Sequence, residues 1–100
     1  MYILTNKNNK VLYTGLTDNL CRRVLEHILK INEGFTKRYN VDKLLYFEEF
    51  GSSDEAMKRE KQIKAGSREK KIKLINQTNP GWHNLFHEIC SEHEENEIVK

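Results

Sequence analysis

Two short segments near the start of the chain are rich in β-branched and aromatic residues, and an asparagine-rich stretch separates them. These segments, residues 2–5 and 11–14, predict a β-hairpin, because such residue types favour strands and asparagine favours turns. If residues 6–9 form the loop, Tyr2 falls opposite Tyr13. Both phenols would then lie on one face of the sheet as a cross-strand pair.

The rest of the chain predicts helices and one further strand. The expected elements are a helix over about 19–31, a loop with a helical turn over 32–40, a strand over 44–50, and helices over about 53–65 and 67–78. Thr17 or Asp18 can cap the first helix. Ser52 fits a capping box for the second, which Gly66 ends, and Ser67 can cap the third.

Length and composition describe one small domain. The chain has 100 residues, of which 37% are hydrophobic and 32% charged, which is typical of a soluble globular protein. No apolar run is long enough to cross a membrane, and no signal peptide is evident, so a cytoplasmic location is expected. Cys21 and Cys90 are far apart in the sequence and show no metal-ligand spacing, so neither a disulfide nor a zinc site is expected.

The charge is unevenly distributed along the chain. The net charge is +2, but residues 1–82 carry +6 and residues 83–100 carry −4. A basic body suits a polyanionic ligand, although many soluble domains show similar unevenness. We expect residues 1–86 to form the domain and residues 87–100 a flexible acidic tail. Truncation after Glu88 should therefore leave the fold intact.

Arg23 and His27 are four residues apart, so they share one face of the first predicted helix, at the edge of its apolar stripe. The planar guanidinium of arginine binds phosphate oxygens in two-point fashion. A basic helix edge is more often simply a solvated face, and Tyr2 and Tyr13 are by default hairpin packing. A phosphate clamp is therefore one of two interpretations.

Glu60 stands on the apolar side of its predicted helix, with Met57 and Ile63 as neighbours. A shielded carboxylate needs a cation or a metal ion as partner. A salt bridge to Lys64 or Arg59 would satisfy it equally well. Considered alone, Glu60 favours the salt bridge.

Considered together, these residues resemble the GIY-YIG nuclease superfamily over residues 1 to about 85. Tyr2 takes the place of the tyrosine in the first motif triplet. Tyr13-Thr14-Gly15 matches the second triplet, with threonine in place of the usual isoleucine. Arg23 follows that glycine by eight residues, as the family arginine does.

Three further features strengthen this resemblance. His27 stands where family members have a histidine or tyrosine, and Glu60 matches the metal-binding glutamate of a downstream helix. The stretches Gly34-Phe35-Thr36-Lys37 and Asn79-Pro80-x-Trp82 are similar to those of short, single-domain bacterial members.

The resemblance implies an α+β fold with a small three-stranded antiparallel sheet flanked by helices. It also implies a catalytic set and a structural set of residues. The catalytic residues are Tyr2, Tyr13, Arg23, His27 and Glu60, and the structural motif residues are Gly15, Asn79 and Trp82. One divalent cation, Mg²⁺ or Mn²⁺, would be held by Glu60 and water, and would stabilise the leaving oxygen.

The same resemblance implies roles for the other catalytic residues. Arg23 would steady the phosphorus in the transition state. A tyrosine, with Tyr2 favoured over Tyr13, would take a proton from the attacking water. His27 would either orient the phosphate or help a tyrosine to lose its proton.

The expected partner is DNA or another nucleic acid, bound through its backbone phosphates. The residues expected at that surface are Lys37, Arg38, Lys58, Arg59, Lys61, Lys70, Lys71 and Lys73. No base-reading element is evident, so cleavage should be structure-directed or weakly specific. Two alternatives stay open: a non-catalytic nucleic-acid-binding module, and an interaction domain to which a protein partner supplies specificity.

Overall fold

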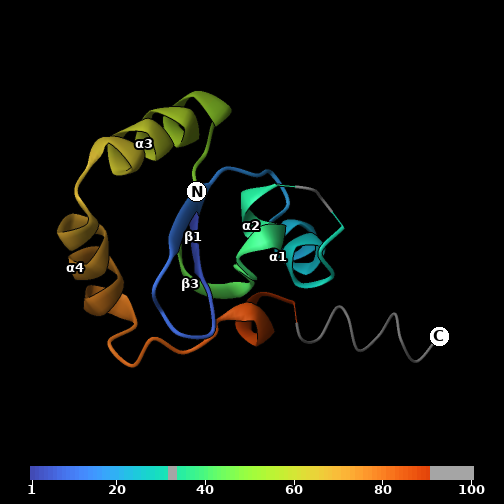
Figure 1. Cartoon of the computed structure of the whole chain (residues 1–100). Coiled ribbons are helices and arrows are strands. Elements are labelled where there is room, and N and C mark those ends of the chain that lie inside the picture. Colours follow the sequence, from blue (N-terminus) through green and yellow to red (C-terminus); the bar gives the residue numbers. More distant parts are fainter. Residues whose placement is uncertain (32–33, 91–100) are drawn as a thin grey trace.

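The protein folds around a three-stranded antiparallel sheet with helices on both faces (Figure 1). The computed structural model describes residues 1–31 and 34–90. The strands are β1 (Tyr2–Thr5), β2 (Leu12–Gly15) and β3 (Lys43–Phe47), in the order β2-β1-β3. The strand that carries Tyr2 is therefore central, and the α+β class implied by the resemblance is confirmed.

The hairpin register differs from the expected one. Tyr2 pairs with Gly15, and Tyr13 pairs with Leu4, so the prediction that Tyr2 lies opposite Tyr13 is wrong. Because side chains alternate along a strand, Tyr2 and Leu4 point to the same face. The two phenols are thus diagonal neighbours on that face, and their ring centroids are 6.3 Å apart.

The side chain of Asn6 explains this register. Its carbonyl oxygen accepts hydrogen bonds from the backbone N–H of Lys10 at 2.9 Å and of Val11 at 3.3 Å. Asn9 adopts a left-handed conformation with φ 58°, which asparagine tolerates better than most residues. The loop therefore spans residues 6–11 rather than the expected four residues.

The helices agree with the expected elements more closely than the hairpin does. They are α1 (Leu20–Ile28), α2 (Phe35–Arg38), α3 (Ser53–Ala65) and α4 (Arg68–Thr78). Ser52 and Ser67 cap α3 and α4 as predicted. The cap of α1 is Asn19, whose side chain accepts from the N–H of Arg22 at 3.1 Å, so the prediction of Thr17 or Asp18 is wrong. Over the described ranges, no helix is long and apolar enough to cross a membrane.

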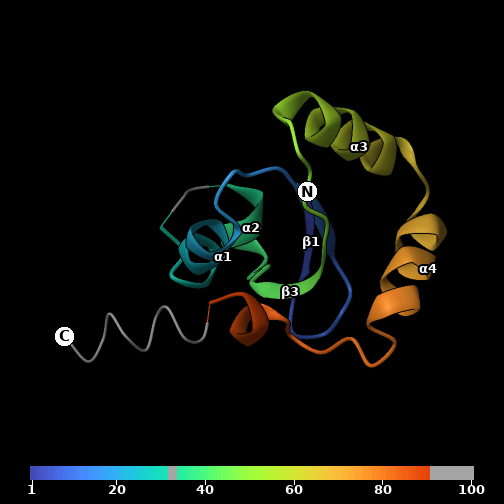
Figure 2. The same ribbon diagram turned by 180° about the vertical axis from the view of Figure 1, so that it is seen from behind.

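The helices pack as separate layers on the two faces of the sheet, as Figure 2 shows from behind. One cluster joins β1 and β3 to α4 through Ile3, Leu45 and Ile75. The other, on the opposite face, contains Tyr2 and Val24, so it joins β1 to α1. The candidate catalytic residues of β1, β2 and α1 belong to this second layer.

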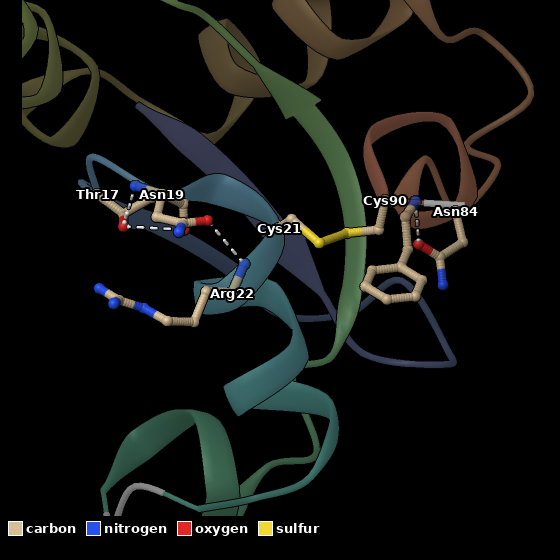
Figure 3. Close-up of a disulfide and its surroundings, with 7 residues drawn as sticks. Thr17, Asn19, Cys21, Arg22, Asn84 and Cys90 are labelled. Atoms are coloured by element: carbon tan, nitrogen blue, oxygen red, sulfur yellow. Dashed lines mark hydrogen bonds between the residues drawn. A yellow bond between two sulfur atoms is a disulfide. The ribbon is translucent and has the colours of Figure 1, made fainter. Parts of the chain in front are cut away.

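A short helical segment at residues 86–90 closes the second layer. Asn84 accepts hydrogen bonds from the backbone N–H of Leu44 at 3.2 Å and of Phe86 at 3.1 Å. Cys90 is 2% exposed and forms a disulfide with Cys21 of α1 (Figure 3). The segment is thus held to both β3 and α1.

This disulfide overturns the expectation that the two cysteines are unpaired. Sixty-nine positions separate Cys21 from Cys90, and only the packing of residues 86–90 against α1 brings them together. The packed body therefore extends beyond the predicted boundary at residue 86. Truncation after Glu88 would remove the partly buried Ile89 and the buried Cys90, so the truncation should destabilise the fold, contrary to the expectation from the sequence. Residues 91–100 of the predicted tail lie outside the described residues.

Candidate functional site

The face of the sheet that packs against α1 brings four of the predicted side chains together. Tyr2 comes from β1, Tyr13 from β2, and Arg23 and His27 from α1. The ring of His27 lies 5.9 Å from that of Tyr2 and 5.7 Å from that of Tyr13, measured between centroids. We call these four residues the tyrosine–histidine cluster.

Gly15 makes room for this cluster. A Cβ atom at this position would collide with the phenol of Tyr2, reaching 2.8 Å from its Cε2 and closer still to the end of the ring. The glycine of the second triplet is therefore needed because the ring of its cross-strand partner passes directly over it.

A chain of buried hydrogen bonds passes through His27. Its Nε2 lies 3.1 Å from the hydroxyl of Tyr2, and its Nδ1 lies 3.0 Å from Oγ1 of Thr36 on α2. A neutral imidazole satisfies both contacts when Nδ1 donates to Thr36 and Nε2 accepts from Tyr2. Thr36 was not among the predicted site residues. The periodicity of α1 gives no signal for a partner that lies on another helix.

Burial sets the protonation states of this chain. Desolvation raises the pKa of Tyr2 to about 12, although the neighbouring Arg23 opposes the shift. Desolvation also lowers the pKa of His27 below its usual 6.5, and the charge of Arg23 acts in the same direction. At neutral pH the phenol is thus protonated and the imidazole neutral, which leaves His27 free to accept a proton.

Arg23 is the charged member of the cluster and is partly exposed to the solvent. Its Nη1 is 3.1 Å from Oε1 of Glu26, and its side chain is 40% exposed. Its Nε is buried and, within the part of the chain that the structure describes, has no hydrogen-bond partner. An unsatisfied buried donor is costly. A phosphate that rearranged this guanidinium would relieve that cost.

Glu60 lies apart from the cluster, on α3. Its side chain is 17% exposed, and its carboxylate is 3.1 Å from Nζ of Lys64, which is the salt bridge considered above. The carboxylates of Glu60 and Glu48 both oppose the lowering of the Met1 amino pKa by burial. Glu60 therefore lies near the amino group of Met1, the residue that precedes Tyr2 and the start of β1.

A single carboxylate is compatible with a hydrated metal ion. Across residues 1–31 and 34–90, no three His, Cys, Asp or Glu side chains gather as metal ligands would. Mg²⁺ keeps most of its water and needs only one or two protein carboxylates. Glu60 fits this role if Lys64 exchanges its partner.

An ion pair fixes the helix that carries Glu60. The Nε and Nη2 atoms of Arg59 donate to the two carboxylate oxygens of Glu48 at 2.9 and 3.0 Å. The hydroxyl of Tyr46 also donates to Glu48, and the bonds from Arg59 and Tyr46 lower the pKa of Glu48. Since α3 has no fully buried residue, this pair helps to hold the helix to the residue that follows β3, and Ile63 packs against the first core cluster. Arg59 is predicted to contact DNA, but its guanidinium is thus already paired with Glu48.

The structure divides the predicted nucleic-acid-binding residues between the two layers. Lys37 and Arg38 lie on α2, on the side of the tyrosine–histidine cluster. The remaining six lie on α3 and α4, and α4 packs against the opposite face through Ile75. The eight side chains therefore do not lie on one flat surface.

The predicted motif residues Asn79 and Trp82 lie at the end of α4. The amide of Asn79 donates to the carbonyl oxygens of Leu45 at 3.1 Å and His83 at 2.9 Å. The indole of Trp82 donates to Asn76 at 2.6 Å, and its ring packs against the first cluster. Both residues hold the chain after α4 against the sheet.

This small sheet, with two tyrosines, an arginine and a histidine on one face, has the arrangement of a nuclease-type catalytic domain. The chain belongs to the GIY-YIG family, a nuclease family: the family model described as the GIY-YIG catalytic domain matches residues 1–83. No solved structure matches the chain.

Its relatives are short proteins of similar length. A UPF0213 protein of Staphylococcus haemolyticus is 41% identical over 75 residues, which cover 75% of this chain and 90% of that protein. A UPF0213 protein of Syntrophus aciditrophicus is 42% identical over 78 residues, or 77% and 88% of the two chains. One of Natronomonas pharaonis is 39% identical over 75 residues, or 75% and 87%. These names state no activity.

Proposed function

We propose that this protein is a divalent-metal-dependent endonuclease that hydrolyses phosphodiester bonds in DNA, with structure-directed or weak sequence specificity. The contact of 3.1 Å between the Tyr2 hydroxyl and Nε2 of His27 carries this proposal. It joins a phenol to a neutral base inside a domain of a nuclease family. A buried tyrosine alone, with a pKa of about 12, would be a poor base at neutral pH.

The proposed proton path uses this contact. As a water oxygen attacks phosphorus, the water proton passes to the oxygen of Tyr2, and the phenol proton passes to Nε2 of His27. Thr36 holds His27 in the tautomer that can accept it. The bond between phosphorus and the leaving oxygen then breaks, and that oxygen takes a proton from the solvent. Tyr2 is 1% exposed, so the water must approach past the partly exposed Tyr13 and Arg23.

Charge stabilisation would come from Arg23 within the cluster and from a cation held by Glu60. Arg23 would donate to the phosphate oxygens as negative charge develops on them. A divalent cation held by Glu60 and water would supply Lewis-acid stabilisation of the phosphate and the leaving oxygen. DNA would be bound through its backbone phosphates, and a protein partner would supply further specificity.

Replacing Glu60 with glutamine tests this proposal. We expect a loss of about 10²-fold or more in nicking of labelled linear, flap and branched DNA with Mg²⁺ or Mn²⁺, because an amide holds the cation far less well than a carboxylate. Paramagnetic broadening by Mn²⁺ near residue 60 should disappear in the same variant.

The matched control is Glu69→Gln, an exposed carboxylate in the first turn of α4. It should nick at close to the wild-type rate. Wild-type protein that binds these DNAs but leaves every one uncut would favour the non-catalytic binding module. Full activity in Glu60→Gln would remove Glu60 from the site.

The loss of cleavage activity at acidic pH should reflect the protonation of His27. His27 accepts a proton only when neutral, and burial lowers its pKa below 6.5. Activity should therefore stay high down to pH 6.5 and fall only on further acidification. In His27→Gln, whose activity should be much lower, this loss at acidic pH should be absent.

The same pKa shift affects folding. The pKa of His27 is lower in the folded chain than in the unfolded chain, so between these two pKa values the unfolded chain binds more protons. The contribution of His27 to the free energy of unfolding is therefore present above pH 6.5 and is lost as the pH falls through the folded-state pKa. Urea titrations across this range should show that loss in the wild type and a smaller one in His27→Gln. Identical activity profiles in the two proteins would contradict the assignment.

A further inference from the structure

An exposed row of aromatic rings extends outward from the tyrosine–histidine cluster. The ring of Phe35 is stacked on that of Tyr13, with centroids 6.4 Å apart and planes 21° apart. The ring of Tyr39 follows, 4.8 Å from that of Phe35. The row thus begins at a candidate catalytic residue and ends at the C-cap of α2. The helix α2 lies beside α1 (Figure 1).

The two outer rings of this row, Phe35 and Tyr39, belong to neither core cluster. Phe35 is 50% exposed and Tyr39 is 44% exposed, whereas Thr36, between them in the sequence, is buried against His27. The helix α2 therefore attaches itself to the cluster through Thr36, while Phe35 at its start and Tyr39, its C-cap residue, present their rings to the solvent. Exposed aromatic groups that lie together commonly mark a binding surface.

The charges around these rings suit an anionic ligand. The guanidinium carbon of Arg38 lies 5.6 Å from the centroid of the Tyr39 ring, and Lys37 lies on the same helix. Two carboxylates of neighbouring described residues are paired: Glu26 with the arginines of α1, and Asp42 with Lys30 at 3.7 Å. Flat apolar rings with cations beside them are what a nucleotide base and its phosphate need.

We propose that Phe35 and Tyr39 form a stacking platform for the unpaired bases of a polynucleotide, so that the substrate carries a single-stranded segment next to the cleaved bond. This inference rests on the proposed function for the position of the cut but not for the binding. A base stacked on Phe35 would place its phosphate near Tyr13 and Arg23. In an intact duplex, neighbouring base pairs cover both faces of each base, so no face is free to stack on the rings.

Binding in EDTA separates this platform from catalysis. Fluorescence anisotropy would compare a single-stranded 12-mer, a blunt hairpin duplex, and a 12-mer of abasic deoxyribose phosphates, which keeps the charge but lacks bases. We expect Phe35→Ala to weaken binding of the single strand by about 5- to 100-fold, which is the usual effect of losing one stacked base. Binding of the duplex and of the abasic strand should change less than about twofold.

Three further variants make the test specific. Tyr39→Ala should resemble Phe35→Ala, and Phe35→Trp should bind the single strand at least as well as the wild type because a larger ring is retained. Met57→Ala removes a side chain of similar exposure, 45%, on α3 and should have no effect. A 2-aminopurine base in the single strand should be quenched by the wild type and not by Phe35→Ala.

Other results would overturn the platform. An equal loss of abasic-strand binding in Phe35→Ala would show that Phe35 acts through charge or folding rather than through stacking, and unchanged single-strand binding would show that no base contacts it. A loss of duplex binding in Phe35→Ala as large as the loss of single-strand binding would also exclude it. Base-dependent binding without any cleavage would instead retain the platform and refute the nuclease.

Discussion

Replacing Arg23 with alanine is expected to lower the rate of DNA cleavage by about 10²- to 10³-fold, which is the usual loss when a donor to the transition-state oxyanion is removed. Arg23 acts on the pKa values of both Tyr2 and His27, so its charge is felt at the Tyr2–His27 pair. Its buried Nε lacks a hydrogen-bond partner among the described residues, so a rearrangement of the guanidinium would let this N–H donate to a phosphate. The rate would be measured at saturating DNA with Mg²⁺.

The chain supplies its own control for this prediction. Arg22 is the adjacent residue and also lies near Glu26, at 4.0 Å, but its side chain is 66% exposed. Arg22→Ala should cleave within about twofold of the wild type. Arg23→Lys should be intermediate, because lysine keeps the charge but loses the two-point fork. Equal losses in the two alanine variants, with unchanged melting temperatures, would show that only the total positive charge matters.

Local signals in the sequence predict most of the fold. Ser52 and Ser67 cap helices because each hydroxyl satisfies a free N–H in the next turn, and both caps are confirmed. The four-residue spacing of Arg23 and His27 places them on one helix face, and the structure brings both of them to Tyr2. These features depend on neighbours within one helical turn, so the sequence alone contains the necessary information.

The hairpin register could not be predicted in this way. The loop has six residues because the Asn6 side chain bonds to two backbone N–H groups across it, and several asparagines compete for such a role in this stretch. A shift of register changes which residue opposes Tyr2. The close packing of Gly15 under the Tyr2 ring follows from the observed pairing and was therefore not foreseen.

Contacts between distant elements account for the remaining differences. Thr36 reaches His27 only because α2 folds back on α1, and Arg59 reaches Glu48 only because α3 follows β3 at a particular angle. Glu60 illustrates the same limit. Its shielded position was predicted, but helix periodicity could not decide between Lys64 and a metal ion as its partner, and the structure shows the pairing with Lys64.

The Cys21–Cys90 disulfide is the long-range contact with the largest expected effect on stability. Cys90→Ser is expected to lower the free energy of unfolding by about 2–4 kcal/mol, because the disulfide closes a long loop and so restricts the unfolded chain. For a domain of this size, that corresponds to a fall of roughly 10–25 °C in melting temperature. Thermal unfolding followed by circular dichroism would measure it.

The reducing agent provides the matched control for this second prediction. Reduced wild type, Cys21→Ser and Cys90→Ser should all melt at about the same temperature, well below the oxidised wild type, since each lacks the same bond. Two titratable thiols in the unreduced protein, or an unchanged melting temperature on reduction, would show that the two cysteines are not bonded.

The disulfide also affects the candidate site, because α1 carries Cys21 as well as Arg23 and His27. Loss of the bond should free the segment at residues 86–90 from α1. Amide hydrogen exchange should then increase in α1 and near the tyrosine–histidine cluster. It should remain low in α4, which packs on the other face of the sheet.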